Sequence, residues 1–298
     1  MAPEASLELA AGVARSATAP RGRSAGALRR LLADGAAIVG LALIVLLALT
    51  AGLAPVLAPF DPTAVSLARA YQGPDPEHWL GTDEVGRDIL SRLLYGARLS
   101  LATGLIAVAV ALALGVPVGL VAGYGGPTAD LLLMGVMDVM LAFPALLLAI
   151  LIVTILGAGA ESAMLAVGLS SVPIFARLVR ASTLTIRQSD YVSAARALGV
   201  SAPVLVLRHV LPNALSPLLV QSTLRIATAI LTAAGLGFLG LGAQPPAAEW
   251  GLMLNQGRAY LQTAPHIVLF PSLAIMLAVL AFNLFGDGLN DALNPRLR

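Results

Sequence analysis

Lysine and cysteine are both missing from this chain of 298 residues, so its 18 basic residues are all arginine. Without lysine, the chain cannot supply the phosphate-binding lysine of a Walker A nucleotide-binding loop. Without cysteine, it has no disulfide, no thiolate metal site and no cysteine nucleophile, and the redox compartment stays undetermined. ATP binding of the P-loop kind and thiol chemistry are therefore excluded.

Charged residues are scarce as well. They make up only 11% of the chain, against about 25% in an ordinary soluble domain, while hydrophobic residues make up 58%. The 18 basic and 16 acidic residues give a net charge of +2, which implies no nucleic-acid-binding surface. This composition excludes a soluble enzyme.

The apolar residues gather in six blocks, and a bilayer core about 30 Å thick needs about 20 apolar residues of helix. The third block contains one charge, Asp138, and the fifth contains Arg225. The fourth is short, and we expect it to continue as helix through Arg177 and Arg180, whose long side chains can snorkel or project into water. We predict an all-α polytopic membrane protein with six transmembrane helices, within residues 36–57, 100–123, 131–156, 162–176, 213–235 and 266–285.

The arginines predict an orientation. Most of them lie in an N-terminal arm of residues 1–35, in the segment that follows the fourth block, and in the C-terminal tail. The positive-inside rule then places both termini and the loop of about residues 177–212 in the cytoplasm. The first apolar block is longer than a signal-peptide core of roughly 7 to 15 residues, so we expect a retained membrane helix. The six-helix domain is predicted to cover residues 36–298.

The loop after the fourth block is predicted to contain a short helix. Ser189 or Asp190 is placed to cap its start, and Gly199 suits a left-handed stop at its end. Ala195 and Gly199 lie four residues apart on one face, where their small size would let a partner approach the backbone. A solvated connector helix is the alternative, and spacing alone does not decide between the two.

The outside loops have patterns of their own. In the loop that precedes the second block, Thr82 or Asp83 is placed to cap a short helix. A glycine-rich outside loop covers residues 235–251. His78 is expected to be a loop hydrogen-bonder. It has no second histidine at ligand spacing, and His209 and His266 are similarly isolated, so no metal site is predicted.

Four motifs of the chain resemble a known family. The loop Tyr191-Val192-x-Ala194-Ala195-Arg196-Ala197-Leu198-Gly199 with Leu211-Pro212 looks like the cytoplasmic EAA loop of binding-protein-dependent ABC importer permeases. Two outside stretches and a C-terminal one resemble the C-type permease of the dipeptide, oligopeptide and nickel importers, most of all the dipeptide permeases. They are Gly81-Thr82-Asp83-x-x-Gly86-Arg87-Asp88, Gln244-Pro245-Pro246-x-x-Glu249-Trp250-Gly251 and Asn283-x-x-Gly286-Asp287-x-Leu289-x-Asp291-x-Leu293-Asn294-Pro295-Arg296. The resemblance covers about residues 35–298. Two positions depart from it: Ser193 stands where the family has glutamate, and Gly135 where many relatives have arginine.

The resemblance implies a type I ABC importer permease fold and one half of a translocation pathway for dipeptides or oligopeptides, with nickel chelates as the alternative cargo. It implies a second, non-identical permease, two ATPase domains and an extracytoplasmic substrate-binding lipoprotein as partners. ATP and magnesium would be bound by the ATPase subunits, so this chain would carry no cofactor and no catalytic residue. The implied ATPase-coupling residues are Tyr191, Val192, Ala194, Ala195, Arg196, Ala197, Leu198, Gly199 and Pro212.

The fifth block carries a polar stripe. Gln221, Arg225, Thr228 and Thr232 are spaced 4, 3 and 4 residues apart and so share one helical face. An arginine at mid-membrane costs at least a few kcal/mol unless it meets water or a partner. Two interpretations stay open. The stripe lines the pathway, or Arg225 forms a structural ion pair with Asp138 or with the partner permease.

Two other protein classes fit less well. An intramembrane hydrolase would need a nucleophile and a base at depth, yet the chain has no Gly-x-Ser-x-Gly, no His-Glu-x-x-His and no paired intramembrane aspartates. A secondary transporter typically has two repeated halves and ion-binding carboxylates. This chain has one intramembrane carboxylate and no evident repeat, so a secondary transporter is the alternative outside the ABC class.

Overall fold

The computed structural model describes residues 29–293, so most of the predicted N-terminal arm and the last five residues lie outside it. The described part is helical and has no strand. Its long helices are α3 (Gly35–Leu57), α4 (Ile89–Tyr124), α5 (Pro127–Leu141), α6 (Ala145–Leu156), α7 (Ala160–Arg187), α10 (Leu211–Phe238) and α12 (His266–Leu293). Its short elements are η1 (Leu67–Arg69), α8 (Asp190–Ala197), α9 (Ala202–Leu205), the π-helical turn η2 (Val206–Val210), α11 (Trp250–Gly257) and η3 (Arg258–Tyr260).

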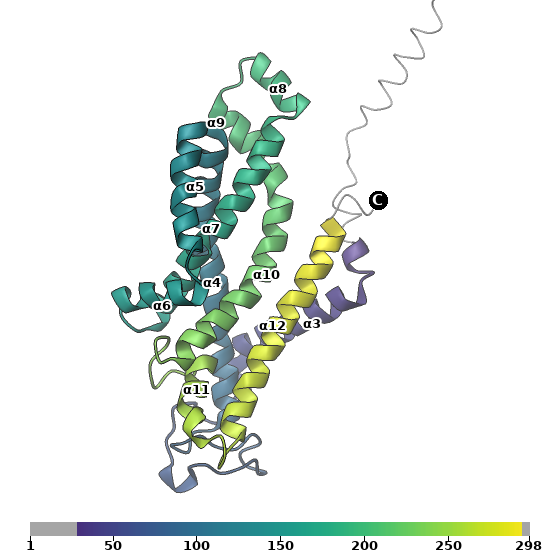
Figure 1. Ribbon diagram of the computed structural model, residues 1–298. Helices are drawn as coiled ribbons and strands as arrows, with labels where there is room; N and C mark the ends of the chain where they lie inside the picture. The colour runs from purple at the N-terminus through teal and green to yellow at the C-terminus, as the bar shows by residue number, and fades with distance from the viewer. Residues whose placement is uncertain (1–28, 294–298) are drawn as a thin grey trace, which may run out of the picture.

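The helices form an elongated bundle with two distinct ends (Figure 1). The short helices α8 and α9 cap one end, which we call the α8 end. The loop between α3 and α4, together with α11, closes the other, which we call the loop end. Helices α3 and α12 pair along one side, where a Cβ on Gly288 would lie 2.3 Å from that of Ala37. The start of α3 therefore lies beside the end of α12.

The predicted membrane helices are present, with one correction. Five helices are long and apolar enough to span a membrane: α3, α4, α7, the continuous run Ala202–Phe238 and α12. The third block is not one straight helix, because α5 and α6 meet at 95°. Pro144 stands at the break, where its missing N–H and fixed φ disfavour a continuous helix. Six crossings result only if this bent pair counts as one span.

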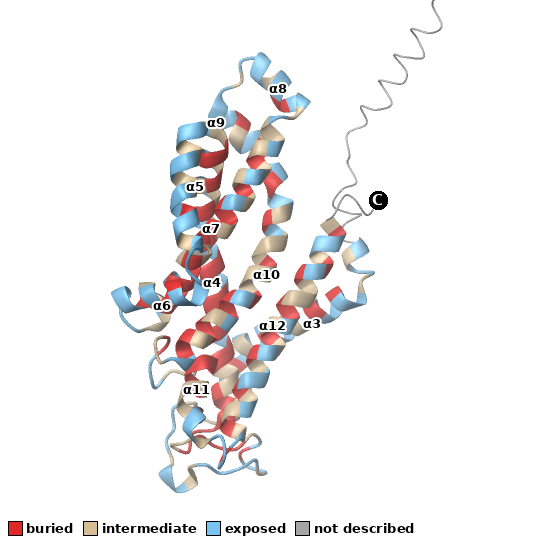
Figure 2. Ribbon diagram, in the orientation of Figure 1, coloured by how far each residue is buried: buried red, intermediate tan, exposed pale blue. Residues whose placement is uncertain are grey.

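The closest helix packing joins α4 to α7. Gly115, Gly119 and Gly123 recur every four residues on the α4 face that meets α7, and all three are buried. A Cβ on Gly119 would lie 2.4 Å from the carbonyl oxygen of Ala176 and 2.7 Å from the Cβ of Val179. Small residues at this spacing let two membrane helices approach backbone to backbone. Figure 2 shows buried residues concentrated along α4 and around α11.

A buried ionic cluster fastens the outer loop. The Nε of Arg87 donates to Asp83 Oδ2 at 2.6 Å, and its Nη2 donates to Glu84 Oε1 at 2.8 Å. The Nε of Arg92 lies 3.3 Å from the same Asp83 oxygen, and the side chain of Arg92 is 1% exposed. Burial, with the neighbouring Asp83 charge, raises the pKa of Glu84. The cluster gives the motif between Gly81 and Asp88 a structural role.

The predicted cap of this loop is wrong. Asp88, not Thr82 or Asp83, caps α4, and its carboxylate accepts from the amide of Ser91 at 2.7 Å. Asp88 also lies 2.9 Å from Nδ1 of His78, which makes His78 the loop hydrogen-bonder that the sequence predicts. The helix starts late because Gly86 holds a positive φ of 79°. A Cβ on Gly86 would lie 1.9 Å from a backbone carbonyl oxygen, so the turn admits only glycine.

The second outside motif also attaches to α4. Glu249 caps α11 and accepts from the amides of Gly251 and Leu252 at 2.9 and 2.8 Å. Ser100 of α4 donates to the same carboxylate at 3.2 Å. Burial raises the pKa of Glu249. The neighbouring Trp250 is buried and donates from its indole to a carbonyl of α4 at 3.1 Å, so both outer motifs hold the loops against one helix.

Candidate functional site

Helix α8 stands at the extreme α8 end of the molecule, between α7 and α10 (Figure 1). Ser189 occupies its N-cap position, but the hydroxyl donates back to the carbonyl of Ile186 at 2.6 Å, so the predicted side-chain cap is not formed. Gly199 follows the helix with a φ of 80°, the left-handed conformation expected of it. A Cβ there would meet nothing within 4 Å, so only the backbone conformation restricts this position.

Most residues of α8 are open to solvent. Val192 is fully buried and anchors the helix, while Tyr191 is 47% exposed and Leu198 is 85% exposed. Ala195 is half-buried, and the remaining motif residues are exposed: Ala194, Arg196, Ala197 and Gly199, with Pro212 at the start of α10. Tyr191 and Leu198 therefore leave apolar surface exposed at the α8 end.

Polar contacts tie α8 to the ends of two long helices. Arg196 Nη2 lies 3.4 Å from the hydroxyl of Tyr124 at the end of α4, and its guanidinium stands 5.9 Å from the centre of that ring. Tyr191 accepts from Nδ2 of Asn213 at 3.3 Å and packs its ring against His209. Through these contacts and its two chain connections, α8 is joined to α4, α7 and α10.

The four residues of the polar stripe all lie on α10, but their side chains differ in hydrogen bonding and in burial. Thr228 and Thr232 donate their hydroxyls to carbonyls of their own helix at 3.1 and 2.8 Å. Arg225 is half-buried and, among the described residues, forms no ion pair. Gln221 is likewise half-buried. The face opposite is mixed, since Ile230 is buried and Leu219 is 56% exposed.

The structure gives Asp138 a different partner from the one considered above. Its carboxylate pairs with Nη2 of Arg177 at 2.6 Å, so the Arg225–Asp138 pair, one of the two interpretations left open by the sequence, is not formed. One turn closer to the α8 end, Arg180 makes two contacts with Asp130, the second at 2.6 Å. Arg177 and Arg180 therefore do more than snorkel, because each forms an ion pair that joins α7 to α5. The sequence analysis missed these pairs, although two aspartates eight residues apart share one face of α5.

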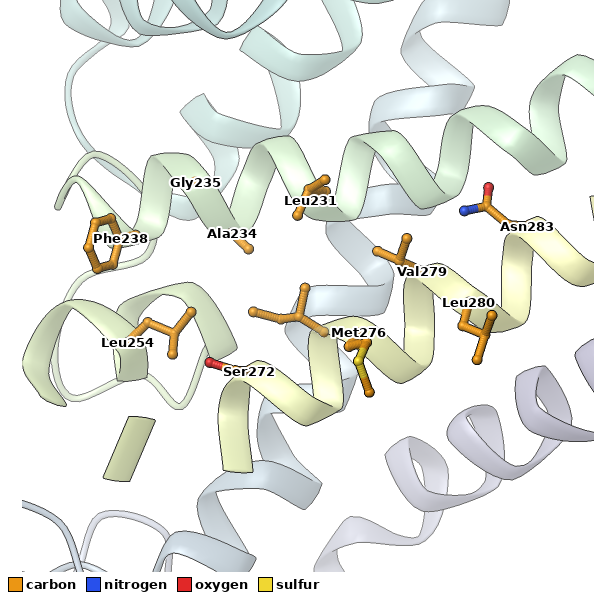
Figure 3. A pocket seen from close by; sticks show the side chains of 11 residues that line it. Leu231, Ala234, Gly235, Phe238, Leu254, Ser272, Met276, Val279, Leu280 and Asn283 are labelled. Atoms are coloured by element: carbon orange, nitrogen blue, oxygen red, sulfur yellow. The ribbon is translucent and has the colours of Figure 1, made fainter. Parts of the chain in front are cut away.

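A cavity of about 650 Å³ opens between α10, α11 and α12. Figure 3 shows its wall of aliphatic and aromatic side chains, with Ser272 at one end and Asn283 at the other. The hydroxyl of Ser272 donates to the carbonyl of Val268 at 2.8 Å, so it is already satisfied. The wall is otherwise formed by Leu231, Ala234, Gly235, Phe238, Leu254, Ile275, Met276, Val279 and Leu280.

Comparison with known proteins identifies the class. Residues 115–298 match the family described as the binding-protein-dependent transport system inner membrane component. The chain belongs to this permease family. Residues 23–74 also match the N-terminal transmembrane domain of oligopeptide transport permease C, which confirms the resemblance drawn from the motifs.

The curated relatives of this permease are close and nearly full-length. It is 48% identical over 272 residues to a dipeptide transport system permease protein of Alkalihalophilus pseudofirmus, covering 91% of this chain and 90% of that protein. It is 47% identical over 271 residues to a glutathione transport system permease protein of Pectobacterium atrosepticum, with coverage of 91% and 90%.

Solved structures support the fold. The permease matches an inward-facing structure of the MetNI methionine ABC transporter with a TM-score of 0.56 and 21% identity, over 68% of this chain and 96% of that chain. It matches an amino acid ABC transporter with a TM-score of 0.52 and 16% identity, over 66% and 92%. The predicted type I ABC importer permease fold is confirmed.

Family membership fixes the general role of the chain. It is a transmembrane permease subunit of an ATP-driven ABC importer, located in the inner membrane, and it is not an enzyme. ATP hydrolysis is the task of separate subunits, and the family name implies a substrate-binding protein. Among the described residues no cluster of three or more histidine, aspartate or glutamate side chains is placed to hold a metal.

Proposed function

We propose that this permease imports dipeptides or oligopeptides. The supporting observation is its identity of 48% and 47%, over nine-tenths of the chain, to permeases named for dipeptide and glutathione transport. Glutathione is itself a tripeptide, so both names specify small peptides. Cargo selection in such systems is shared with the binding protein, and the permease contributes half of the membrane pathway.

The assembly we propose has a second, non-identical permease beside this one, two ATPase domains and a substrate-binding lipoprotein. The α8 end faces the cytoplasm, because the arginine-rich segment of residues 177–208 leads to it and the positive-inside rule favours that side. Since α3 starts and α12 ends toward that same side, both termini are cytoplasmic, with residues 1–35 forming an arm and residues 36–298 the permease domain.

We further propose that α8 is the helix that receives the ATPase. Val192 anchors it, and exposed Tyr191 and Leu198 offer apolar surface to a groove in the partner. Because α8 is fastened to α4 and α10, a movement of the ATPase would be passed to long helices rather than absorbed by a flexible loop. The stripe of Gln221, Arg225, Thr228 and Thr232 is proposed to line the pathway, with Arg225 carrying its only full charge.

The cargo is tested on the purified transporter, assembled from this chain, its partner permease, the ATPases and the binding protein, in proteoliposomes. Labelled Ala-Ala, glutathione and a nickel–histidine chelate are offered with ATP on the cytoplasmic side. We expect ATP-dependent uptake of at least one of the two peptides. Uptake of the nickel chelate alone would contradict the peptide assignment, and ATP-independent uptake by this chain alone would contradict the proposed mechanism.

A further inference from the structure

The pair formed by Arg177 and Asp138 stands in an unusual place for charged side chains. Asp138 lies eleven residues after the start of α5, and Arg177 lies ten residues before the end of α7. Asp138 lies seven residues inside the third apolar block, which is about 10 Å of helix, and Arg177 follows the end of the fourth block. The side chain of Asp138 is nevertheless 59% exposed, and that of Arg177 is 52% exposed. A bilayer disfavours an exposed carboxylate inside a span, so this face of the subunit meets water or protein.

The pair also has unused bonding capacity. One contact holds it, from Nη2 of Arg177 to Oδ1 of Asp138. Among the described residues, Oδ2 of Asp138 and the Nε and Nη1 of Arg177 have no hydrogen-bond partner. The neighbouring Arg180–Asp130 pair is different, because two contacts hold it and its side chains are 34% and 25% exposed. A half-exposed pair with a single contact opens at little cost.

The space around the pair is open to a ligand. A Cβ placed on Gly135, one turn before Asp138, would meet nothing within 4 Å. One turn after Asp138 the helix ends, and α6 leaves at 95° to α5, so that it does not continue along the face of the pair (Figure 1). Figure 2 shows the outward side of α5 exposed along its length.

A free peptide carries an ammonium at one end and a carboxylate at the other. We propose that Asp138 and Arg177 form a station on the import route for such a zwitterion, in which Asp138 binds the peptide ammonium and Arg177 binds the peptide carboxylate. The two residues satisfy each other when no cargo is present and exchange that contact for the cargo's two ends. This inference rests on the proposed peptide cargo.

The absence of cysteine from the chain permits a direct test. In the assembled transporter, Gly135→Cys introduces one thiol into this chain, beside the pair. A charged, membrane-impermeant thiol reagent then reports whether water reaches that position. Val136→Cys is the matched control, because Val136 is 57% exposed but lies on the far flank of α5. We expect labelling of the cysteine at position 135 and none at 136. Dipeptide import with ATP should slow labelling at 135 several-fold.

The role of the charges is tested in the same background. Asp138→Asn and Arg177→Gln should each lower Ala-Ala uptake roughly tenfold, the usual effect of losing a charged hydrogen-bond partner, and should abolish the protection by cargo. Asp130→Asn serves as the control, since it alters a structural pair and should leave cargo protection of the 135 thiol in place.

Three results would overturn the station. They are an unreactive cysteine at 135, loss of the partner permease from the Asp138→Asn complex, and labelling that does not respond to cargo while the unmutated transporter imports peptide. If the unmutated transporter imports no peptide at all, the failure belongs to the proposed function instead.

Discussion

Gly115, Gly119 and Gly123 form a glycine seam between α4 and α7, where a very small added group should have a large effect. Gly119→Ala adds one methyl group whose carbon would lie 2.4 Å from the carbonyl oxygen of Ala176 and 2.7 Å from the Cβ of Val179. Ordinary contacts begin near 3.4 Å. The two helices would have to separate by about 1 Å, because the atoms in the way are backbone and a Cβ and cannot turn aside.

The magnitude follows from two opposing terms. Overpacking of this kind costs about 1 to 3 kcal/mol. Replacing glycine by alanine inside a helix recovers about 0.5 to 1 kcal/mol through helix propensity. We expect the free energy of unfolding of Gly119→Ala to fall by about 1 kcal/mol, near the middle of the range of about 0 to 2.5 kcal/mol that the two terms give. Gly135→Ala is the matched control, since its methyl group meets nothing within 4 Å and only the favourable term applies.

The measurement is unfolding of the purified chain in mixed micelles of increasing SDS, followed by far-ultraviolet circular dichroism. Gly119→Ala should unfold at lower SDS than the unmodified chain, and Gly135→Ala at the same or higher SDS. Equal stability of the two variants, within about 0.5 kcal/mol, would refute the claim that close backbone approach holds α4 against α7.

Two further predictions concern α8 and the outer loops. Ala195→Leu and Gly199→Leu should leave membrane insertion intact but uncouple or lose the ATPase subunits, because added volume disturbs a packed interface and a Cβ strains the left-handed turn by about 1 kcal/mol. Uptake, ATP hydrolysis and subunit content are measured for each variant and compared with those of Ala68→Leu, which changes an exposed alanine at the loop end. Ser193→Glu restores the family residue and should be tolerated. Normal coupling of ATP hydrolysis to uptake in both leucine variants would contradict the docking role of α8. Since burial raises the pKa of Glu249, its contribution to the free energy of unfolding is largest below the ordinary glutamate pKa and is lost as the pH rises through the raised value. Unfolding measured across that pH range should show a smaller fall in Glu249→Gln, and an identical fall would mean that this carboxyl does not control it.

The long helices were predictable from hydropathy, but their directions were not. The apolar blocks locate each membrane helix, and the first block agrees with α3 to within one residue. The third block hides a sharp bend, because Pro144 lies inside an unbroken apolar run and composition does not say whether a proline kinks a helix or ends it. The N-cap of α4 was also not predictable from the sequence, since the positive φ of Gly86 delays the start of the helix, and Asp88 becomes the cap.

The pairing of charges was the least predictable feature. The sequence places the charge of Asp138 inside an apolar block, but several arginines lie in or near the predicted spans, and a linear pattern does not say which spans adjoin. Arg225 has the more conspicuous position, in the middle of an apolar block. The structure instead brings Arg177 to Asp138, because the glycine seam draws α7 against α4 and α5 folds back beside both. Tertiary neighbours decide such contacts, and one sequence does not contain them.

Helix α7 links the two ion pairs to α8. α7 runs unbroken from Ala160 to Arg187, and a two-residue turn joins it to α8, so a displacement of α8 reaches the α7 arginines through that turn. The two contacts of Arg180 with Asp130 bind α5 to α7, and the Gly119 seam binds α4 to α7. Helices α4, α5 and α7 therefore tend to move as one body. The single contact between Arg177 and Asp138 lies inside that body, so an incoming zwitterion has only this weak contact to exchange and need not part the helices that carry it.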